Sequence, residues 1–215
     1  MAPARSKGKI VVAAIGMIAL VAIGILVALP GDDEQPARVV VKEGSIQRPA
    51  PGEALARGER ATVRFETNLG TFAVALDGER SPIAANNFAY LARSGFYDGL
   101  GFHRIVPGFV IQGGDPRGDG TGGPGYRVVD PPERGAIYGP GTVAMAKSAA
   151  DPRGAAGSQF FIVTADRPID LPAEYAIVGQ VSAGRSVVEE IGRLGGPDEI
   201  PTETVVIERA RLIEE

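Results

Sequence analysis

Hydrophobic and polar residues alternate along much of the chain after residue 60, which is the pattern typical of half-buried β-strands. Residues 62–67 and 71–76 alternate on either side of an Asn-Leu-Gly turn and predict a β-hairpin. Two segments, 81–94 and 186–194, carry apolar residues at helical spacing and predict amphipathic helices. Further strands are expected on either side of Pro107-Gly108 and at residues 142–146, 158–164, 175–181 and 204–213.

This set of about seven or eight strands and two helices predicts a mostly β fold: a closed antiparallel barrel capped by the helices. The first helix also has recognisable ends. Ser81 and Pro82 supply an N-cap and a first-turn proline, and Gly95 supplies a C-terminal stop.

A different pattern precedes the strands. Residues 10–29 contain no charged side chain, and twenty residues of helix span about 30 Å, the thickness of the hydrocarbon core of a bilayer. Residues 1–9 are basic, which predicts a cytoplasmic stub, a single transmembrane helix over 10–29 and an extracytoplasmic remainder at the cell membrane. A cleaved signal peptide would have a shorter apolar core and a better cleavage site than Val27–Pro30, so an uncleaved anchor is favoured.

The residues that follow the apolar segment are rich in proline, glycine and charge. Residues 30–60 are therefore predicted to be a flexible tether, and residues 61–215 the folded domain.

Composition excludes several function classes. The chain has 22 basic and 26 acidic residues, a net charge of −4 and no basic stripe, so we expect no nucleic-acid partner. It has no cysteine and one histidine, which excludes a disulfide framework, a thiolate zinc site and a multi-histidine metal site. The glycine-rich loop over 113–125 lacks the lysine of a phosphate-binding loop. No metal or cofactor is expected.

The segment 101–115 carries the candidate chemistry, because a guanidinium and an amide lie among apolar residues there. Strand alternation predicts that Phe102 and Arg104 point to one face and His103 to the other, while Val110 and Gln112 share a face. A cation, an amide and apolar side chains on one shallow surface favour recognition of an uncharged, peptide-like substrate. The same alternation places Gln159, Phe161 and Val163 of the strand 158–164 on one face, opposite Phe160 and Ile162.

Several short motifs, taken in order, resemble those of the cyclophilins, the cyclophilin-type peptidyl-prolyl isomerases. The motifs are Asn87-Phe88, Ser94-Gly95-Phe96-Tyr97-Asp98-Gly99, Phe102-His103-Arg104, Pro107-Gly108-Phe109, Gln112-Gly113-Gly114-Asp115, Gly120-Thr121-Gly122-Gly123, Met145-Ala146 and Gly157-Ser158-Gln159-Phe160-Phe161. The resemblance covers roughly residues 61–213, and the order and spacing of the motifs make it specific.

The resemblance implies an eight-stranded cyclophilin-like barrel with a helix at each end and an active groove on its outer surface. It implies that Arg104 and Gln112 are catalytic and that the ligands are proline-containing segments of client proteins. The substrate-binding residues it implies are Phe102, Phe109, Val110, Ala146, Lys147, Gln159, Phe161, Leu171 and Tyr175.

The mechanism implied for Arg104 needs no covalent step. Rotation about an amide bond has a barrier of about 18–20 kcal/mol, and the prolyl nitrogen becomes a hydrogen-bond acceptor as the amide twists. A donor at that nitrogen binds the twisted state better than the planar one. Arginine is permanently charged, so activity is expected to be nearly flat from about pH 6 to 9.

Three positions depart from the best-known pattern of the family. Lys147 stands where asparagine follows Met-Ala, Asp170 where many members carry tryptophan, and Tyr175 where they carry histidine. The pocket wall formed by residues 165–175 is therefore expected to differ. With no tryptophan in the chain, we expect weak cyclosporin binding and retained isomerase activity.

Two other functions remain open from the sequence. A non-catalytic, membrane-tethered module that binds proline peptides or acts as a chaperone would keep the groove, and the substitutions at Asp170 and Tyr175 favour it slightly. A membrane-anchored assembly protein would use the barrel only as a scaffold. A tetrapeptide isomerisation assay separates an isomerase, expected to be monomeric and to act on extracytoplasmic folding proteins, from both.

Overall fold

A computed structural model describes residues 52–214 of the chain. The predicted basic stub, transmembrane helix and most of the tether lie outside the described residues. Within residues 52–214, no helix is long and apolar enough to cross a membrane.

The described segment is mostly β, as predicted. Its elements in order are β1 (Ala61–Thr67), β2 (Gly70–Leu76), α1 (Pro82–Arg93), β3 (Phe102–Val106), β4 (Val110–Gly113), β5 (Val128–Val129), β6 (Thr142–Met145), β7 (Ala155–Ala156), β8 (Phe160–Val163), β9 (Ile177–Ala183), α2 (Arg185–Gly192), the 3-10 helix η1 (Pro197–Glu199) and β10 (Ile207–Glu214). Each helix and strand predicted within residues 61–214 is present, with ends shifted by a few residues. The pairing of β5 with β7 was not predicted, because two-residue strands are too short to show a hydrophobic period.

Eight of the strands form one antiparallel sheet in the order β10-β1-β2-β9-β6-β8-β4-β3. The sheet curves into a half-barrel, and the prediction of a closed barrel is wrong at one seam. The edge strands β3 and β10 do not form a ladder; the residues just before them, Gly101 and Val206, form a single bridge. Hydrogen bonds from Phe102 N–H to Val205 O and from Gly99 N–H to Ile207 O hold this crossing, which ends where β10 begins.

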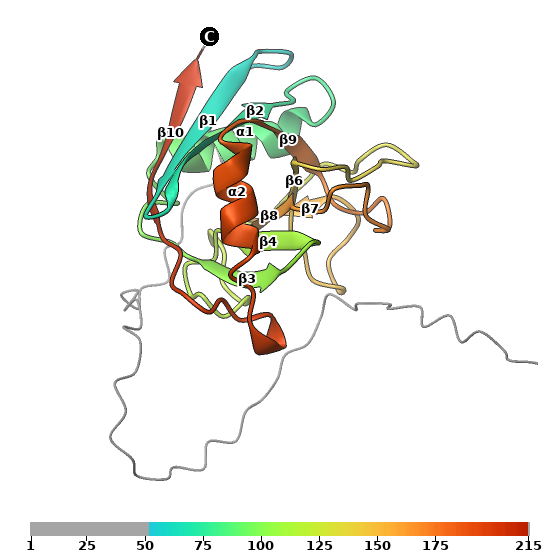
Figure 1. Ribbon diagram of the computed structural model, residues 1–215. Helices are drawn as coiled ribbons and strands as arrows, with labels where there is room; N and C mark the ends of the chain where they lie inside the picture. The colour runs from blue at the N-terminus through green and yellow to red at the C-terminus, as the bar shows by residue number, and fades with distance from the viewer. Residues whose placement is uncertain (1–51, 215) are drawn as a thin grey trace, which may run out of the picture. The chain divides into compact units, whose positions relative to one another are not determined.

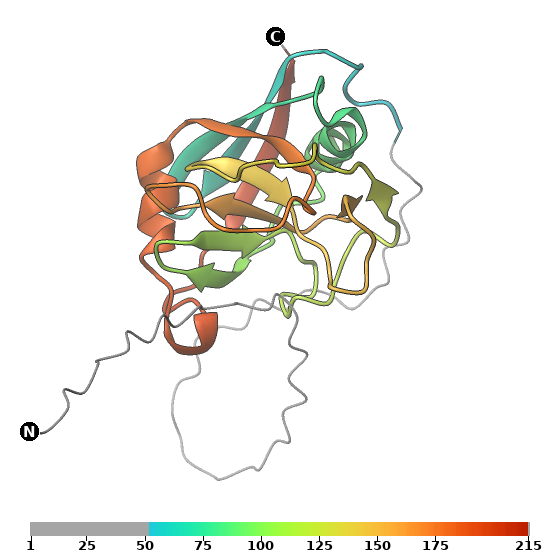
Figure 2. The ribbon, with the colours of Figure 1, turned by 90° about the vertical axis from the view of Figure 1, so that its right-hand side faces the viewer.

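The two helices lie on opposite sides of the curved sheet, with the strands between them (Figures 1 and 2). Helix α1 contacts β9 and β10, and α2 contacts β2, β3 and β4. Between them is an aromatic core whose ring centroids lie 4.9–6.1 Å apart. The rings belong to Phe65, Phe72, Phe88, Tyr97 and Phe160. These rings lie on the inner side of the sheet, so the outer face of β3, β4, β8 and β6 is formed by other side chains.

Helix α1 has the predicted ends but not the predicted cap. Ser81 occupies the N-cap position and makes no side-chain capping hydrogen bond. Asp130 does so instead, because its Oδ2 accepts from the backbone N–H groups of Ile83 and Ala84, each at 2.9 Å. Gly95 follows the helix at a φ of 68°, a left-handed conformation that favours glycine.

The folded domain begins before the predicted boundary at residue 61. Ala54 and Leu55 are 6% and 5% exposed and pack in the hydrophobic core. Their backbone N–H groups both donate to Asn86 Oδ1 on α1, at 2.7 and 2.9 Å. A polar side chain on the helix therefore fixes the end of the segment that composition alone assigns to a tether.

Candidate active site

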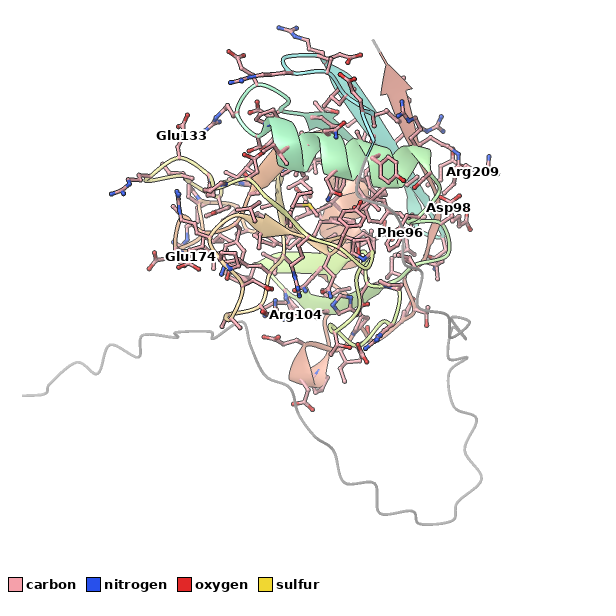
Figure 3. The ribbon with its side chains drawn as sticks, turned by 180° about the vertical axis from the view of Figure 1, so that it is seen from behind. Phe96, Asp98, Arg104, Glu133, Glu174 and Arg209 are labelled. Atoms are coloured by element: carbon pink, nitrogen blue, oxygen red, sulfur yellow. The ribbon has the colours of Figure 1, made fainter. Side chains whose placement is uncertain are left out.

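One row of side chains crosses four strands on the outer face of the half-barrel. Arg104 on β3 pairs with Gln112 on β4, Gln112 pairs with Phe161 on β8, and Phe161 pairs with Ala144 on β6. We call these four residues the Arg104 row. The neighbouring row, Ile105, Ile111, Ile162 and Val143, belongs to the core, so the Arg104 row faces away from it. Figure 3 shows Arg104 at the lower edge of the domain, just above the turn of η1.

Phe102 does not join this row, contrary to the expected alternation. Phe102 pairs with Gly113 while Arg104 pairs with Gln112, so β3 bulges at His103. The extra residue turns Phe102 to the core, where it is 2% exposed and its ring centroid lies 6.0 Å from that of Phe160. A substrate-binding role for the Phe102 side chain is therefore corrected: its ring supports the sheet from behind.

Hydrogen bonds join the polar side chains of the site into a series in which each residue donates to the next. Arg104 Nη1 donates to Gln112 Oε1 at 3.4 Å, and Gln112 Nε2 donates to Gln159 Oε1 at 3.0 Å. Gln159 Nε2 donates in turn to the carbonyl oxygens of Gly120 and Gly122, each at 2.9 Å. A guanidinium can only donate and carbonyl oxygens can only accept, so the two ends fix the orientation of both amides.

Arg104 also contacts an acidic residue from a distant part of the chain. Its Nε donates to Glu199 Oε2 of η1 at 2.5 Å. The Arg104 side chain is 23% exposed and the Glu199 side chain 48% exposed, so the pair is partly open to solvent. Among residues 52–214, Nη2 of Arg104 makes no hydrogen bond. Glu199, Arg104, Gln112 and Gln159 together form what we call the polar chain.

Beside the polar chain, three aromatic rings form what we call the outer aromatic cluster: Tyr138, Phe161 and Tyr175. The centroids of Phe161 and Tyr175 lie 5.5 Å apart at 86°, and those of Tyr138 and Tyr175 lie 6.1 Å apart. The hydroxyl of the fully buried Tyr138 donates to Tyr175 O and accepts from Tyr175 N–H, both at 3.0 Å. Burial and then the Glu174 carboxylate raise the pKa of Tyr175, while Arg104 lowers it, so its hydroxyl is protonated at neutral pH.

Lys147 supports this cluster, and its ammonium is held by other residues of the domain. Its side chain is 4% exposed, and Nζ lies 2.9 Å from Glu174 Oε2 and 5.7 Å from the centroid of the Tyr175 ring. Nζ also donates to the carbonyl oxygens of Ser148 and Asp151. Since these contacts use all the donors of the ammonium, the expected substrate contact of Lys147 is left to its backbone.

The other residues implied by the family resemblance lie at or next to the same strands. Val110 pairs with Val163 two rows from Arg104, and the partly exposed Phe109 accepts a hydrogen bond from Thr164 N–H at its carbonyl. Ala146 N–H donates to Gln159 O at 2.8 Å. Leu171 is partly buried in the loop that leads to Tyr175. That loop also carries Asp170, where the family resemblance places a tryptophan, as an exposed residue.

His103 is separate from the Arg104 row. Both of its ring nitrogens are buried and have no hydrogen-bond partner among the described residues. Burial is the main cause that lowers the pKa of His103; Arg104 adds to the effect and Asp115 opposes it. Asp115 accepts hydrogen bonds from the N–H groups of Arg117 and Gly120 and so shapes the adjoining glycine-rich loop. No group of three or more His, Cys, Asp or Glu side chains suited to a metal occurs in the described part of the chain.

Comparison with known proteins decides the family. Residues 62–212 match the family described as cyclophilin type peptidyl-prolyl cis-trans isomerase/CLD. The chain is a cyclophilin. It is 38% identical over 158 residues to the peptidyl-prolyl cis-trans isomerase-like 1 of Aspergillus fumigatus, covering 71% of this chain and 96% of that protein. It is 41% identical over 145 residues to a peptidyl-prolyl cis-trans isomerase of Helicobacter pylori, covering 65% of this chain and 83% of that protein.

Solved structures of cyclophilins support the same family assignment. The crystal structure of a cyclophilin type peptidyl-prolyl cis-trans isomerase from Cryptosporidium parvum superposes with a TM-score of 0.66 at 31% identity, covering 73% of this chain and 99% of that one. A second crystal structure of the same protein, in the presence of the dipeptide Ala-Pro, gives a TM-score of 0.65. This cyclophilin is thus a peptidyl-prolyl cis-trans isomerase, and the predicted family and enzyme class are confirmed.

Two residues of the site could not be predicted from the sequence. Tyr138 is an isolated aromatic residue in a loop, and Glu199 is one of several acids near the end of the chain. No periodic pattern distinguishes either of them. Their partners, Tyr175 and Arg104, lie 37 and 95 residues away, so only the fold brings these pairs together.

Proposed function

We propose that this cyclophilin rotates X-Pro bonds by donating a hydrogen bond from Arg104 to the prolyl nitrogen of the twisted amide. Twisting removes the resonance of the amide and returns a lone pair to that nitrogen. The guanidinium therefore stabilises the twisted state more than either planar isomer, which is the condition for catalysis. The observation that carries the proposal is the placement of Arg104 in one row with Gln112 and Phe161, with Nη2 left without a hydrogen bond among the described residues.

The outer aromatic cluster is the proposed seat of the proline ring. Phe161 lies next to Gln112 in the Arg104 row, and Tyr175 packs edge-on against it, so an apolar wall adjoins the guanidinium. Contacts between this wall and the pyrrolidine ring hold one side of the rotating bond while the other side turns. The structure of the Cryptosporidium protein in the presence of the dipeptide Ala-Pro supports proline-containing peptides as ligands.

The test is a protease-coupled isomerisation assay on a proline tetrapeptide with the full 215-residue chain. A hydrogen bond from a charged donor contributes about 1.5–3 kcal/mol. Loss of such a bond from the transition state lowers the rate about 10- to 150-fold. Arg104→Ala should lose kcat/KM by that factor and keep its thermal unfolding midpoint.

Arg185→Ala is the control, because Arg185 is an exposed arginine of helix α2, outside the Arg104 row, with a carboxylate partner, Glu189. It should keep wild-type kcat/KM. Wild-type turnover by the Arg104→Ala protein would refute the mechanism, and equal losses in both variants would show an effect of charge at any site.

We further propose that the domain is tethered to the cell membrane and acts on extracytoplasmic folding proteins. The support is the uncharged segment 10–29 with basic residues before it and acidic residues after it. In cells that express the chain, the protein should stay in the membrane fraction through an alkaline wash and leave it only with detergent. Protease added outside the cytoplasmic membrane should digest the domain. Release by the wash, or protection from the protease, would contradict the proposal.

A further inference from the structure

The two ends of the loop between α2 and β10 are joined by backbone pairing at its base. Gly195 and Pro201 form an isolated antiparallel bridge, and Gly196 N–H donates to Ile200 O at 2.8 Å. The 3-10 helix η1 forms the tip of this loop. The tip is therefore held by hydrogen bonds at its base, and its side chains have defined directions.

The base of this loop is packed directly on the hairpin that carries Arg104. A Cβ atom at Gly195 would lie 2.5 Å from Pro107 Cδ and 2.6 Å from Ile105 O, so only glycine allows this approach. Ile105 is the neighbour of Arg104 on β3, and β3 contacts η1. The loop and the Arg104 row are thus fixed relative to each other by backbone packing.

The tip of the loop has an unusual backbone. Asp198 and Glu199 have φ values of 57° and 64°, two consecutive residues other than glycine in the left-handed region. Such conformations are unfavourable for residues with a Cβ and persist where the surroundings impose them, often at functional sites. Here they accompany the contact between Glu199 Oε2 and Arg104 Nε.

We propose that Glu199 is a positioning residue of the isomerase site. It holds Nε of Arg104 from one side while Gln112 holds Nη1 from the other, which fixes the guanidinium plane and leaves Nη2 as the donor for substrate. The proposal rests on the proposed role of Arg104. An arginine side chain has many rotamers, so a partner that selects one of them before substrate binds removes an ordering cost from the reaction.

The same pairing sets the charge around Arg104. The Glu199 carboxylate offsets the positive charge of Arg104, so an acidic residue next to the substrate proline gains little attraction from the guanidinium. Glu199→Gln keeps an oxygen that can accept from Nε but removes the negative charge. This variant should favour acidic over basic residues beside the proline, relative to wild type, by about threefold, the size expected of a partly exposed charge pair.

The experiment measures kcat and KM of the full chain on tetrapeptides that carry glutamate, alanine or lysine next to the proline. Glu199→Ala keeps the Cβ and the loop backbone and should lower kcat/KM on the alanine peptide about tenfold, through kcat, because a catalytic donor is misplaced. Glu199→Gln should retain activity within about threefold of wild type on that peptide, because a neutral acceptor keeps a hydrogen bond of roughly 1 kcal/mol. Glu203→Gln removes a charge from an exposed residue of the same region and should change neither rate nor selectivity.

A second pair of variants separates positioning from loop folding. In a protein that already carries Arg104→Ala, adding Glu199→Ala should not lower kcat/KM further, because Glu199 affects the reaction only through Arg104. The proposal is overturned if Glu199→Ala matches or exceeds wild type, if its loss persists in that background, or if Glu199→Gln leaves charge selectivity unchanged. Failure of the proposed function has a different signature: Arg104→Ala itself would then turn over at the wild-type rate, whatever residue stands at position 199.

Discussion

Replacing Tyr138 with phenylalanine tests how the pocket wall is built. The substitution keeps the ring and removes a hydroxyl that both donates to Tyr175 O and accepts from Tyr175 N–H. The described residues offer these two backbone groups no other hydrogen bond. Each lost bond costs about 1 kcal/mol, and a buried group left without a partner adds to that. We therefore expect Tyr138→Phe to lower the free energy of unfolding by about 2–4 kcal/mol, or roughly 4–16 °C in Tm for a domain of this size.

Tyr97→Phe is the matched control for this substitution. Tyr97 is also fully buried, but its hydroxyl makes one hydrogen bond, to Ser158 O at 3.2 Å. Its loss should cost about 1 kcal/mol. Urea unfolding of the full chain, followed by circular dichroism, measures both values. Equal losses in the two variants, within about 0.5 kcal/mol, would refute the claim that Tyr138 holds Tyr175 by two bonds, since the expected difference is one full bond or more.

Two further predictions concern titration and inhibition. Burial lowers the pKa of His103, the single histidine of the chain, so between its ordinary value and its lower folded value the unfolded state binds more protons than the folded state. Stability should therefore fall as pH drops below about 6.5, by at most about 1.4 kcal/mol per pH unit, and His103→Gln should flatten this slope in urea unfolding at pH 5 to 7. The hydrogen bonds that lower the pKa of Asp119 and Asp151 are lost only at more acidic pH, so a slope that is the same in both proteins would contradict the role of His103. Cyclosporin should inhibit weakly, because the chain has no tryptophan and the exposed Asp170 stands where the family resemblance places one. A nanomolar inhibition constant in the tetrapeptide assay would disprove this.

The pattern of hydrophobic and polar residues predicted most helices and strands and one face of the site. In β8, alternation correctly separates Phe160 and Ile162, which lie in the core, from Phe161 on the outer face. In β3 the same rule fails for Phe102, because a bulge at His103 inserts one residue and reverses the face. Alternation counts residues along a strand, whereas a bulge is defined by the pairing with the next strand.

The features that the sequence did not reveal all depend on partners far along the chain. The cap of α1 comes from Asp130, the start of the domain is fixed by Asn86, and Arg104 is held by Glu199. Each of these is a common polar residue without a periodic context. Whether the barrel closes also cannot be predicted from the number of strands, because that number does not say whether the edge strands β3 and β10 form a ladder or are joined only by a single bridge beside them.

The pairing of β1 with β10 also has a consequence for the order in which the chain is made. β1 is the first strand of the domain to be synthesised, and the edge of β1 that faces β10 has no partner until Ile207–Glu214 has left the ribosome. At 5–20 residues per second this interval is roughly 7 to 30 seconds. During it, β1 carries an open row of backbone hydrogen-bonding groups beside Val63 and Phe65, which can pair with another nascent chain. A stop codon before residue 207 would make that interval permanent, so we expect truncated chains to aggregate through their first strand.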